Sequence, residues 1–120
     1  MEPVTNLIST LLNTRTQAHV YHLQTRSYAA HKALQGYYED IVDLIDSYAE
    51  AYQGSYDILR GYKVAPNIRE DDNPIAYFEA VAVFLERIAP QLPDNGDLKN
   101  IMDEITALVK STLYKLKNLK

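Results

Sequence analysis

The sequence predicts an all-α protein, a four-helix bundle with a long connector between its second and third helices. Apolar residues recur at intervals of three and four along four separate segments. Residues that cap or break helices separate these segments, and 120 residues are enough to build one hydrophobic core. We therefore expect a single domain over residues 1–120, with helices over about 3–23, 28–53, 74–89 and 97–117.

The first predicted helix starts at Pro3, a residue that suits the first turn of a helix. When its apolar stripe is extended by threes and fours, the stripe reaches His19 and His22. We therefore expect both histidines to face the buried side of the helix. A short polar connection follows, in which Thr25 or Ser27 can cap the second helix.

The second predicted helix has a regular apolar seam and a glycine at its end. The seam residues, spaced alternately by four and three, are Leu34, Tyr38, Ile41, Ile45, Tyr48 and Tyr52. A long helix with such a seam is typical of a bundle. Gly54 is expected to end the helix as its C-terminal cap.

Residues 55–73 form the expected long connector. Its large apolar residues include Tyr56, Ile58, Leu59 and Tyr62. We therefore expect it to cross the bundle and pack on it, with one short helical turn. Asn73 and Pro74 then supply a cap and a first residue for the third helix, and a turn rich in Asp, Asn and Gly precedes the fourth.

Composition and charge argue against several classes of protein. The absence of cysteine excludes disulfides and thiolate metal sites. There is no apolar run near 18 residues, so we expect no membrane span. The first residues lack the basic and apolar regions of a secretory signal, so a cytoplasmic location is expected. A net charge of −4 argues against broad electrostatic binding of nucleic acid.

The histidines and a run of acidic residues share one stretch of the sequence, residues 19–54. On a helical projection, a polar strip lies directly beside the seam of the second helix. The strip consists of His31, Gln35, Glu39, Asp46 and Glu50. Metal ligands on bundle helices project from such positions, and imidazoles and carboxylates are suitable ligands.

The distance between His31 and the acidic residues Asp46 and Glu50 along the helix determines whether they could bind the same ion. His31 and Asp46 are 15 residues apart, which is about 22 Å along a helix, whereas metal ligands lie about 2.0–2.2 Å from their ion. One copy cannot place both groups at one ion, but an antiparallel second helix from another copy could, with a two-fold axis near residues 39–40. Each of the two sites in this homodimer would draw on both chains for its ligands: His22, His31, Asp46 and Glu50.

Two motifs and one spacing carry a resemblance to a known family. The motifs are H-L-Q-T at 22–25 and Y-A-A-H at 28–31, and Asp46 and Glu50 follow His31 by 15 and 19 residues. This stretch resembles Dps, the ferritin-like DNA-binding family of starved cells, and more closely resembles small ferritin-like proteins of tailed phages. The resemblance implies a ferritin-like bundle with an iron-binding ferroxidase site between subunits; zinc is the alternative metal.

The departures from the Dps pattern include two that bear on the metal site. Gln35 stands where the pattern has an acid, which favours metal binding over ferroxidase turnover. The twelve-residue histidine spacing of the pattern fits His19 to His31, whereas the local sequence fits His22, so both stay candidates for the first-helix ligand. A second function class also stays open, a non-catalytic helical bundle of a phage whose histidines and acids make contacts within an oligomer or with a partner.

Overall fold

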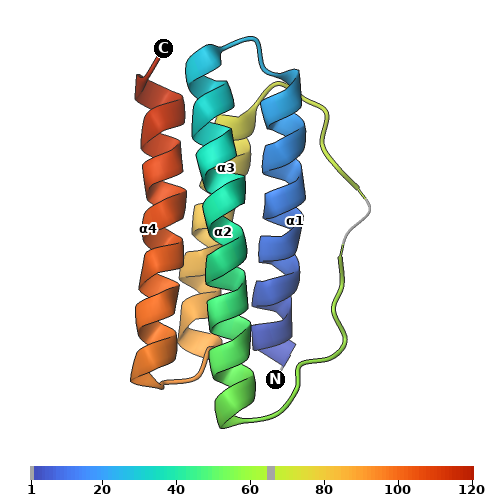
Figure 1. Cartoon of the computed structure of the whole chain (residues 1–120), viewed down its shortest axis with the longest axis vertical. Coiled ribbons are helices and arrows are strands. Elements are labelled where there is room, and N and C mark those ends of the chain that lie inside the picture. Colours follow the sequence, from blue (N-terminus) through green and yellow to red (C-terminus); the bar gives the residue numbers. More distant parts are fainter. Residues whose placement is uncertain (1, 65–66) are drawn as a thin grey trace.

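The computed structural model describes residues 2–64 and 67–120 of the chain. Over these ranges the chain forms an all-helical bundle, which confirms the predicted fold class (Figure 1). Its elements are α1 (Glu2–Gln24), α2 (Tyr28–Ser55), α3 (Pro74–Ile88), the single-turn 3₁₀-helix η1 (Ala89–Gln91) and α4 (Gly96–Asn118). Each α-helix begins and ends within two residues of its expected bounds.

Side-chain caps set the starts of two helices. The side-chain oxygens of Ser27 and Asn73 each accept a hydrogen bond from the backbone N–H three residues later, at 3.2 and 3.1 Å. Ser27, and not Thr25, is therefore the cap of α2. The prediction that Gly54 ends α2 is wrong, because α2 continues to Ser55 and Gly54 does not adopt the positive φ of a glycine cap.

The four helices lie side by side, and every pair of closely packed neighbours is antiparallel (Figure 1). α1 and α4 each pack against both α2 and α3. The diagonal helices α2 and α3 run in the same direction, so the chain between them must travel the full length of the bundle. Its described parts, residues 56–64 and 67–73, run along the outer side of α1 without helical structure (Figure 1).

Apolar side chains from all four helices and the connector form one core. Its fully buried members include Leu7, Leu11, Leu34, Ile41, Phe78 and Ile105. The predicted seam residue Tyr38 is only partly buried and packs against this core, whereas its neighbour Tyr37, which was not predicted there, is fully buried. The Tyr37 hydroxyl finds a partner inside the bundle in the Thr14 hydroxyl, at 2.6 Å, whereas the Tyr38 ring stacks on His19 at the surface.

A row of polar side chains on α1 binds the connector by hydrogen bonds. The members of this row, separated by multiples of four residues, are Thr5, Ser9, Gln17 and Tyr21. For example, the Ser9 hydroxyl accepts the Lys63 N–H at 2.9 Å. Residues four apart lie on one face of a helix, so the row forms a track along α1 that follows the extended connector.

The connector packs on the bundle as the sequence predicts, and Leu59 is its buried anchor. The expected helical turn is not found in its described parts, 56–64 and 67–73. The physical reason is that several of its backbone groups bond to side chains of α1 instead of to one another. Positions 65 and 66 lie outside the described residues.

In the described part of the chain, no helix has both the length and the apolar character needed to cross a lipid bilayer.

Candidate functional site

Two predicted ligands, His22 on α1 and His31 on α2, meet where the two helices join. Their rings are stacked, with centroids 3.7 Å apart and planes inclined by 21°. The Nδ1 of His22 lies 2.9 Å from the carbonyl oxygen of His31, and the Nδ1 of His31 lies 3.0 Å from the carbonyl oxygen of His22. A carbonyl oxygen can only accept a hydrogen bond, so each Nδ1 donates. In both rings, Nε2 is the nitrogen left for a metal or a proton.

This reciprocal arrangement also has a structural role. His22 belongs to the last turn of α1, whose final carbonyls have no helical N–H to accept from. His31 therefore satisfies one of the free carbonyls at the end of α1, while His22 ties its own ring to the first turn of α2. The His22 side chain is buried, with 8% exposed, and His31 is partly buried.

His19 lies on the surface, so the prediction that it faces the buried side is wrong. The buried positions of this part of α1 include Ala18 and His22, and one residue of helix turns the side chain by about 100°. The His19 ring instead stacks on Tyr38, with centroids 4.4 Å apart, and its centroid lies 5.9 Å from that of His22. His19 therefore borders the histidine pair at the surface.

The predicted carboxylates do not join the histidines within one chain. Asp46 and Glu50 are exposed, and because α2 is unbroken they lie about 22 and 28 Å along the helix axis from His31. Gln35, one turn after His31, is partly buried. No described residue forms an ion pair or a side-chain hydrogen bond with Asp46 or Glu50. Among the residues described, no three His, Asp or Glu side chains form a group that could hold a metal ion.

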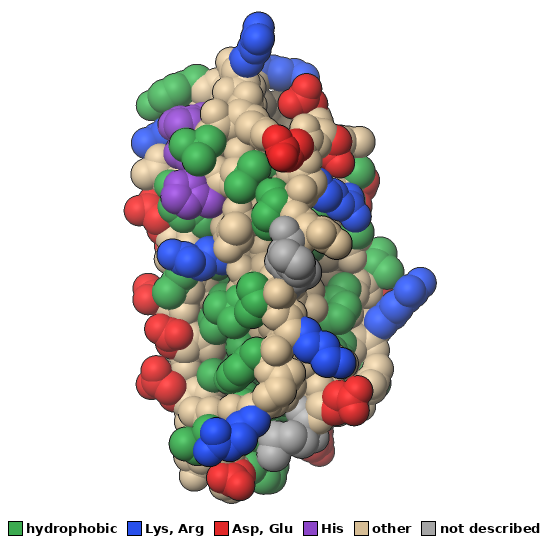
Figure 2. Space-filling view, turned by 90° about the vertical axis from the view of Figure 1, so that its right-hand side faces the viewer, with side chains coloured by type: hydrophobic (Ala, Val, Ile, Leu, Met, Phe, Trp, Pro, Cys, Tyr) green, Lys and Arg blue, Asp and Glu red, His purple; other side chains and the backbone are tan. Residues whose placement is uncertain are grey.

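The histidines and the acids nevertheless occupy one side of the molecule. Figure 2 shows histidine side chains near one end of the face that carries the connector, and acidic side chains along the same edge. Five carboxylates of α2 are exposed: Glu39, Asp40, Asp43, Asp46 and Glu50. The helix thus presents a histidine end and an acidic remainder.

The ring geometry limits how the histidine pair could bind metal. A nitrogen lone pair lies in the plane of its ring, and the two planes are close to parallel. Lone pairs in such planes cannot converge on a single ion about 2.0–2.1 Å from both nitrogens. His22 and His31 therefore suit one ion per ring.

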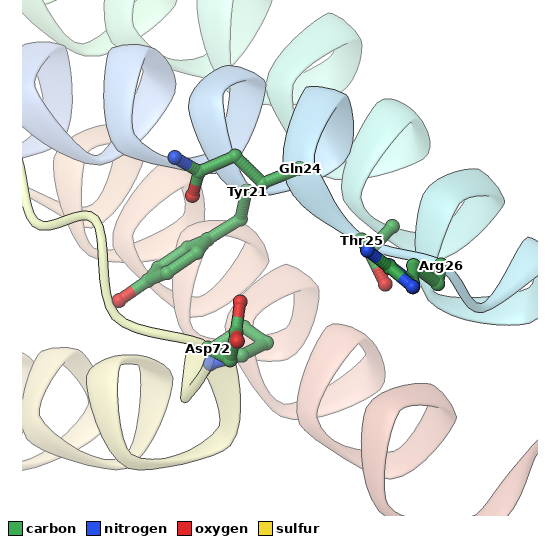
Figure 3. Close-up of a pocket in the computed structure, with 6 residues that line it drawn as sticks. Tyr21, Gln24, Thr25, Arg26 and Asp72 are labelled. Carbon is green, nitrogen blue, oxygen red and sulfur yellow. The ribbon is translucent and has the colours of Figure 1, made fainter.

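A second group of polar residues lies where the connector reaches α3. Figure 3 shows Tyr21 extending from α1 toward the connector, with Asp72 near the start of α3. The Tyr21 hydroxyl donates to Asp71 Oδ1 at 2.7 Å, and this bond is the main cause that lowers the pKa of Asp71. Burial, together with the same bond, raises the pKa of Tyr21 above its usual range.

A pocket of about 240 Å³ adjoins this pair and is lined by residues that include Arg26 and Asp72. The opposite charges of these two residues compensate, so the pocket presents no net charge that would select an ion. Neither the Tyr21–Asp71 bond nor this pocket is predicted from the sequence above. A pattern in the sequence does point to them: polar residues recur at multiples of four along α1 and end at Tyr21. Such a row predicts that another segment of the chain packs along that face of the helix.

Comparisons with known proteins give two matches. A model of a family of unknown function, DUF5856, matches residues 22–116, a range that includes His22, His31, Asp46 and Glu50 but not His19. The chain is also similar to the "uncharacterized 14.6 kDa protein in mobD-ri intergenic region" of Enterobacteria phage T4, with 27% identity over 110 residues, 88% of this chain and 81% of that protein. No solved structure matches the chain. The expected similarity to a phage protein is thus confirmed, and neither matching description mentions ferritin or metal.

Proposed function

We propose that this chain, which belongs to the DUF5856 family of unknown function, binds iron through its paired histidines as a homodimer, with zinc as the alternative metal. The observation that carries the proposal is the reciprocal Nδ1 bonding of His22 and His31. Histidines that ligate metals almost always donate their other ring N–H to a carbonyl, a carboxylate or water, which fixes the tautomer and orients Nε2. Both rings of the pair are held in this way.

In this proposal, Asp46 and Glu50 of a second copy supply the remaining ligands. Both carboxylates are exposed and are not engaged by other described side chains. An antiparallel α2 with its two-fold axis near residues 39–40 would bring the histidine end of one chain to the acidic end of the other. A two-fold interface of this kind generates two equivalent sites.

The order of the helices supports the proposal, and Gln35 limits it to metal binding. Ferritin-like folds are helical bundles with one long crossover connection, and the connector on α1 gives this chain the same order of helices. Fold alone does not determine function, however. Iron, when bound, would supply redox chemistry in the presence of an oxidant, whereas the neutral Gln35 amide stands where an acid would strengthen the site. Metal binding is thus better supported than ferroxidase turnover.

Anaerobic calorimetry with Fe(II), and separately with Zn(II), tests the proposal. We expect His31→Ala and Asp46→Ala to lose binding equally, because each site needs a histidine from one chain and a carboxylate from the other. Glu104→Ala, which removes an exposed carboxylate from α4, is the matched control and should bind like the original protein. Absence of metal uptake, or loss with His31→Ala but not with Asp46→Ala, would contradict the proposed site.

The second candidate function is a non-catalytic bundle that uses this corner as a protein contact. Two large side chains of the corner, Leu23 and Tyr28, are 71% and 76% exposed, and the Tyr28 ring lies over His31 with centroids 6.3 Å apart. Large contiguous patches of exposed apolar side chains mark interaction surfaces, and this alternative requires Leu23 and Tyr28 to belong to one. This function predicts an oligomer that EDTA does not affect. If EDTA dissociates the oligomer or lowers its melting temperature, a bound metal stabilises the fold and this alternative fails.

A further inference from the structure

We propose that a pocket at the other end of the bundle binds a small, neutral ring compound that carries an oxygen acceptor. The pocket has a volume of about 240 Å³ and lies between the second half of α2, the segment around η1 and the start of α4. Apolar side chains that include Leu92, Leu98 and Met102 line it, and Tyr48 lines it as well. The proposal does not depend on metal binding by the histidines.

The Tyr48 hydroxyl is the reason to expect a ligand. Tyr48 is only 1% exposed, and its hydroxyl forms no hydrogen bond with any described residue. Yet among these residues no fully buried side-chain oxygen or nitrogen lacks a partner. The Tyr48 oxygen must therefore reach open space, and the pocket is the space that Tyr48 is known to line. An oxygen acceptor placed there would complete the hydrogen bonding of a side chain that is otherwise buried.

The Tyr48 hydroxyl is protonated at neutral pH and can therefore donate a hydrogen bond. Burial raises the pKa of Tyr48 to about 12, so the hydroxyl keeps its proton at neutral pH. Apolar walls with a few placed polar groups are the usual composition of small-molecule sites. The chemistry therefore favours a ligand that is mostly apolar and accepts one hydrogen bond.

Size and charge narrow the class further. An apolar cavity of about 150 Å³ can hold benzene, so this pocket has room for one ring with a short substituent. Lys99 is a cation at its rim, but it forms an ion pair with Asp94, and Asp103 also acts on it. The lysine charge is thus compensated, and the pocket is not an anion site.

Two probes of similar shape test the hydrogen bond: acetophenone, which has a carbonyl acceptor, and ethylbenzene, which has none. Binding to the full chain is followed by NMR shifts of the Met102 methyl group and of the amides around the pocket. We expect saturable binding of both probes, and Tyr48→Phe should weaken acetophenone about fivefold while leaving ethylbenzene unchanged. That factor corresponds to about 1 kcal/mol for one neutral hydrogen bond. Equal affinity of acetophenone for both proteins would overturn the donor role.

A second variant tests the pocket independently of Tyr48. Ala89 lines the pocket and is itself exposed, so Ala89→Phe can fill the space without disturbing the core. It should abolish the binding of both probes, whereas Ala80→Phe, at an exposed position of α3 outside the pocket, should not. Circular dichroism verifies that both variants are folded. Shifts that do not saturate, or that persist in Ala89→Phe, would overturn the proposed site.

Discussion

Gln17 holds both polar groups of the Arg69 backbone: its Nε2 donates to the Arg69 carbonyl and its Oε1 accepts the Arg69 N–H, each at 2.8 Å. The Gln17 side chain is 2% exposed, so its amide has exchanged water for these two bonds. The Gln17 side-chain amide thus pairs with the Arg69 backbone as the backbone of a neighbouring β-strand would. This contact fixes the connector to α1 and thereby sets the path that lets α2 and α3 run parallel.

Substitution of Gln17 should loosen the connector. Gln17→Leu keeps a side chain of similar length but removes both hydrogen bonds and leaves the Arg69 backbone groups without their partner. We expect the free energy of unfolding in urea to fall by about 1–3 kcal/mol. Thr16→Leu, at an exposed neighbouring position, is the control and should change it little. Trypsin should also cut Gln17→Leu faster after Arg60 and Arg69, and unchanged cleavage would mean that other contacts hold the connector.

The Tyr21–Asp71 bond should contribute stability only above a threshold in pH. The folded chain lowers the pKa of Asp71, so the unfolded chain binds more protons in this range and stability rises with pH. The contribution is complete above the ordinary Asp pKa of about 3.9 and is lost as the pH falls through the lower folded value. We therefore expect Tyr21→Phe to be less stable than the original protein at pH 7. The difference between the two proteins should shrink below about pH 4, and a constant difference would contradict this account.

Buried tyrosines should make the bundle sensitive to alkali. Burial raises the pKa of Tyr48 and of Tyr77 to about 12, from an ordinary value near 10. Between these values the unfolded chain has released protons that the folded chain retains, so each tyrosine lowers the free energy of unfolding by about 1.4 kcal/mol per pH unit. Ionisation of these phenols, followed by absorbance at 295 nm, should coincide with loss of helical circular dichroism. If these phenols ionise near pH 10 while the helices persist, the raised pKa values are wrong.

The histidine pair should stabilise the fold even without metal. His22→Ala and His31→Ala each remove one Nδ1–carbonyl bond and the ring stack, so their effects overlap. A double-mutant cycle in the presence of EDTA should give a coupling of about 1–2 kcal/mol. His19→Ala combined with His31→Ala is the control pair, because these two side chains share no hydrogen bond or ring contact, and its effects should be closer to additive. Additive effects of His22→Ala and His31→Ala would show that the two side chains do not act as a unit.

Periodicity and caps were sufficient to predict the helices, because burial of an apolar stripe and the supply of cap hydrogen bonds are local requirements. The choice of core residue fails where two neighbouring residues both suit a buried position. Tyr37 and Tyr38 are the same residue type one position apart, and contacts with other helices, the Thr14 hydroxyl in α1 and the Phe78 ring in α3, accompany the burial of Tyr37. The separation of His31 from Asp46 followed from helix rise alone. The stacking of His22 on His31 could not be predicted in this way. It depends on the path of the turn between α1 and α2 and on hydrogen bonds to backbone carbonyls, which the spacing of residues in the sequence does not reveal.

The proposed dimer makes a prediction that needs no metal. If two α2 helices pair antiparallel about an axis near residues 39–40, each chain places its Glu39 opposite the same region of its partner, while the two Glu50 side chains lie far apart. The sequence has no cysteine, so single-cysteine variants report one position each. Under mild oxidation, Glu39→Cys should form a disulfide-linked dimer on a non-reducing gel, and Glu50→Cys should not. A parallel pair would cross-link at both positions, and a monomer at neither. Either of these results would remove the route by which Asp46 and Glu50 reach the histidines.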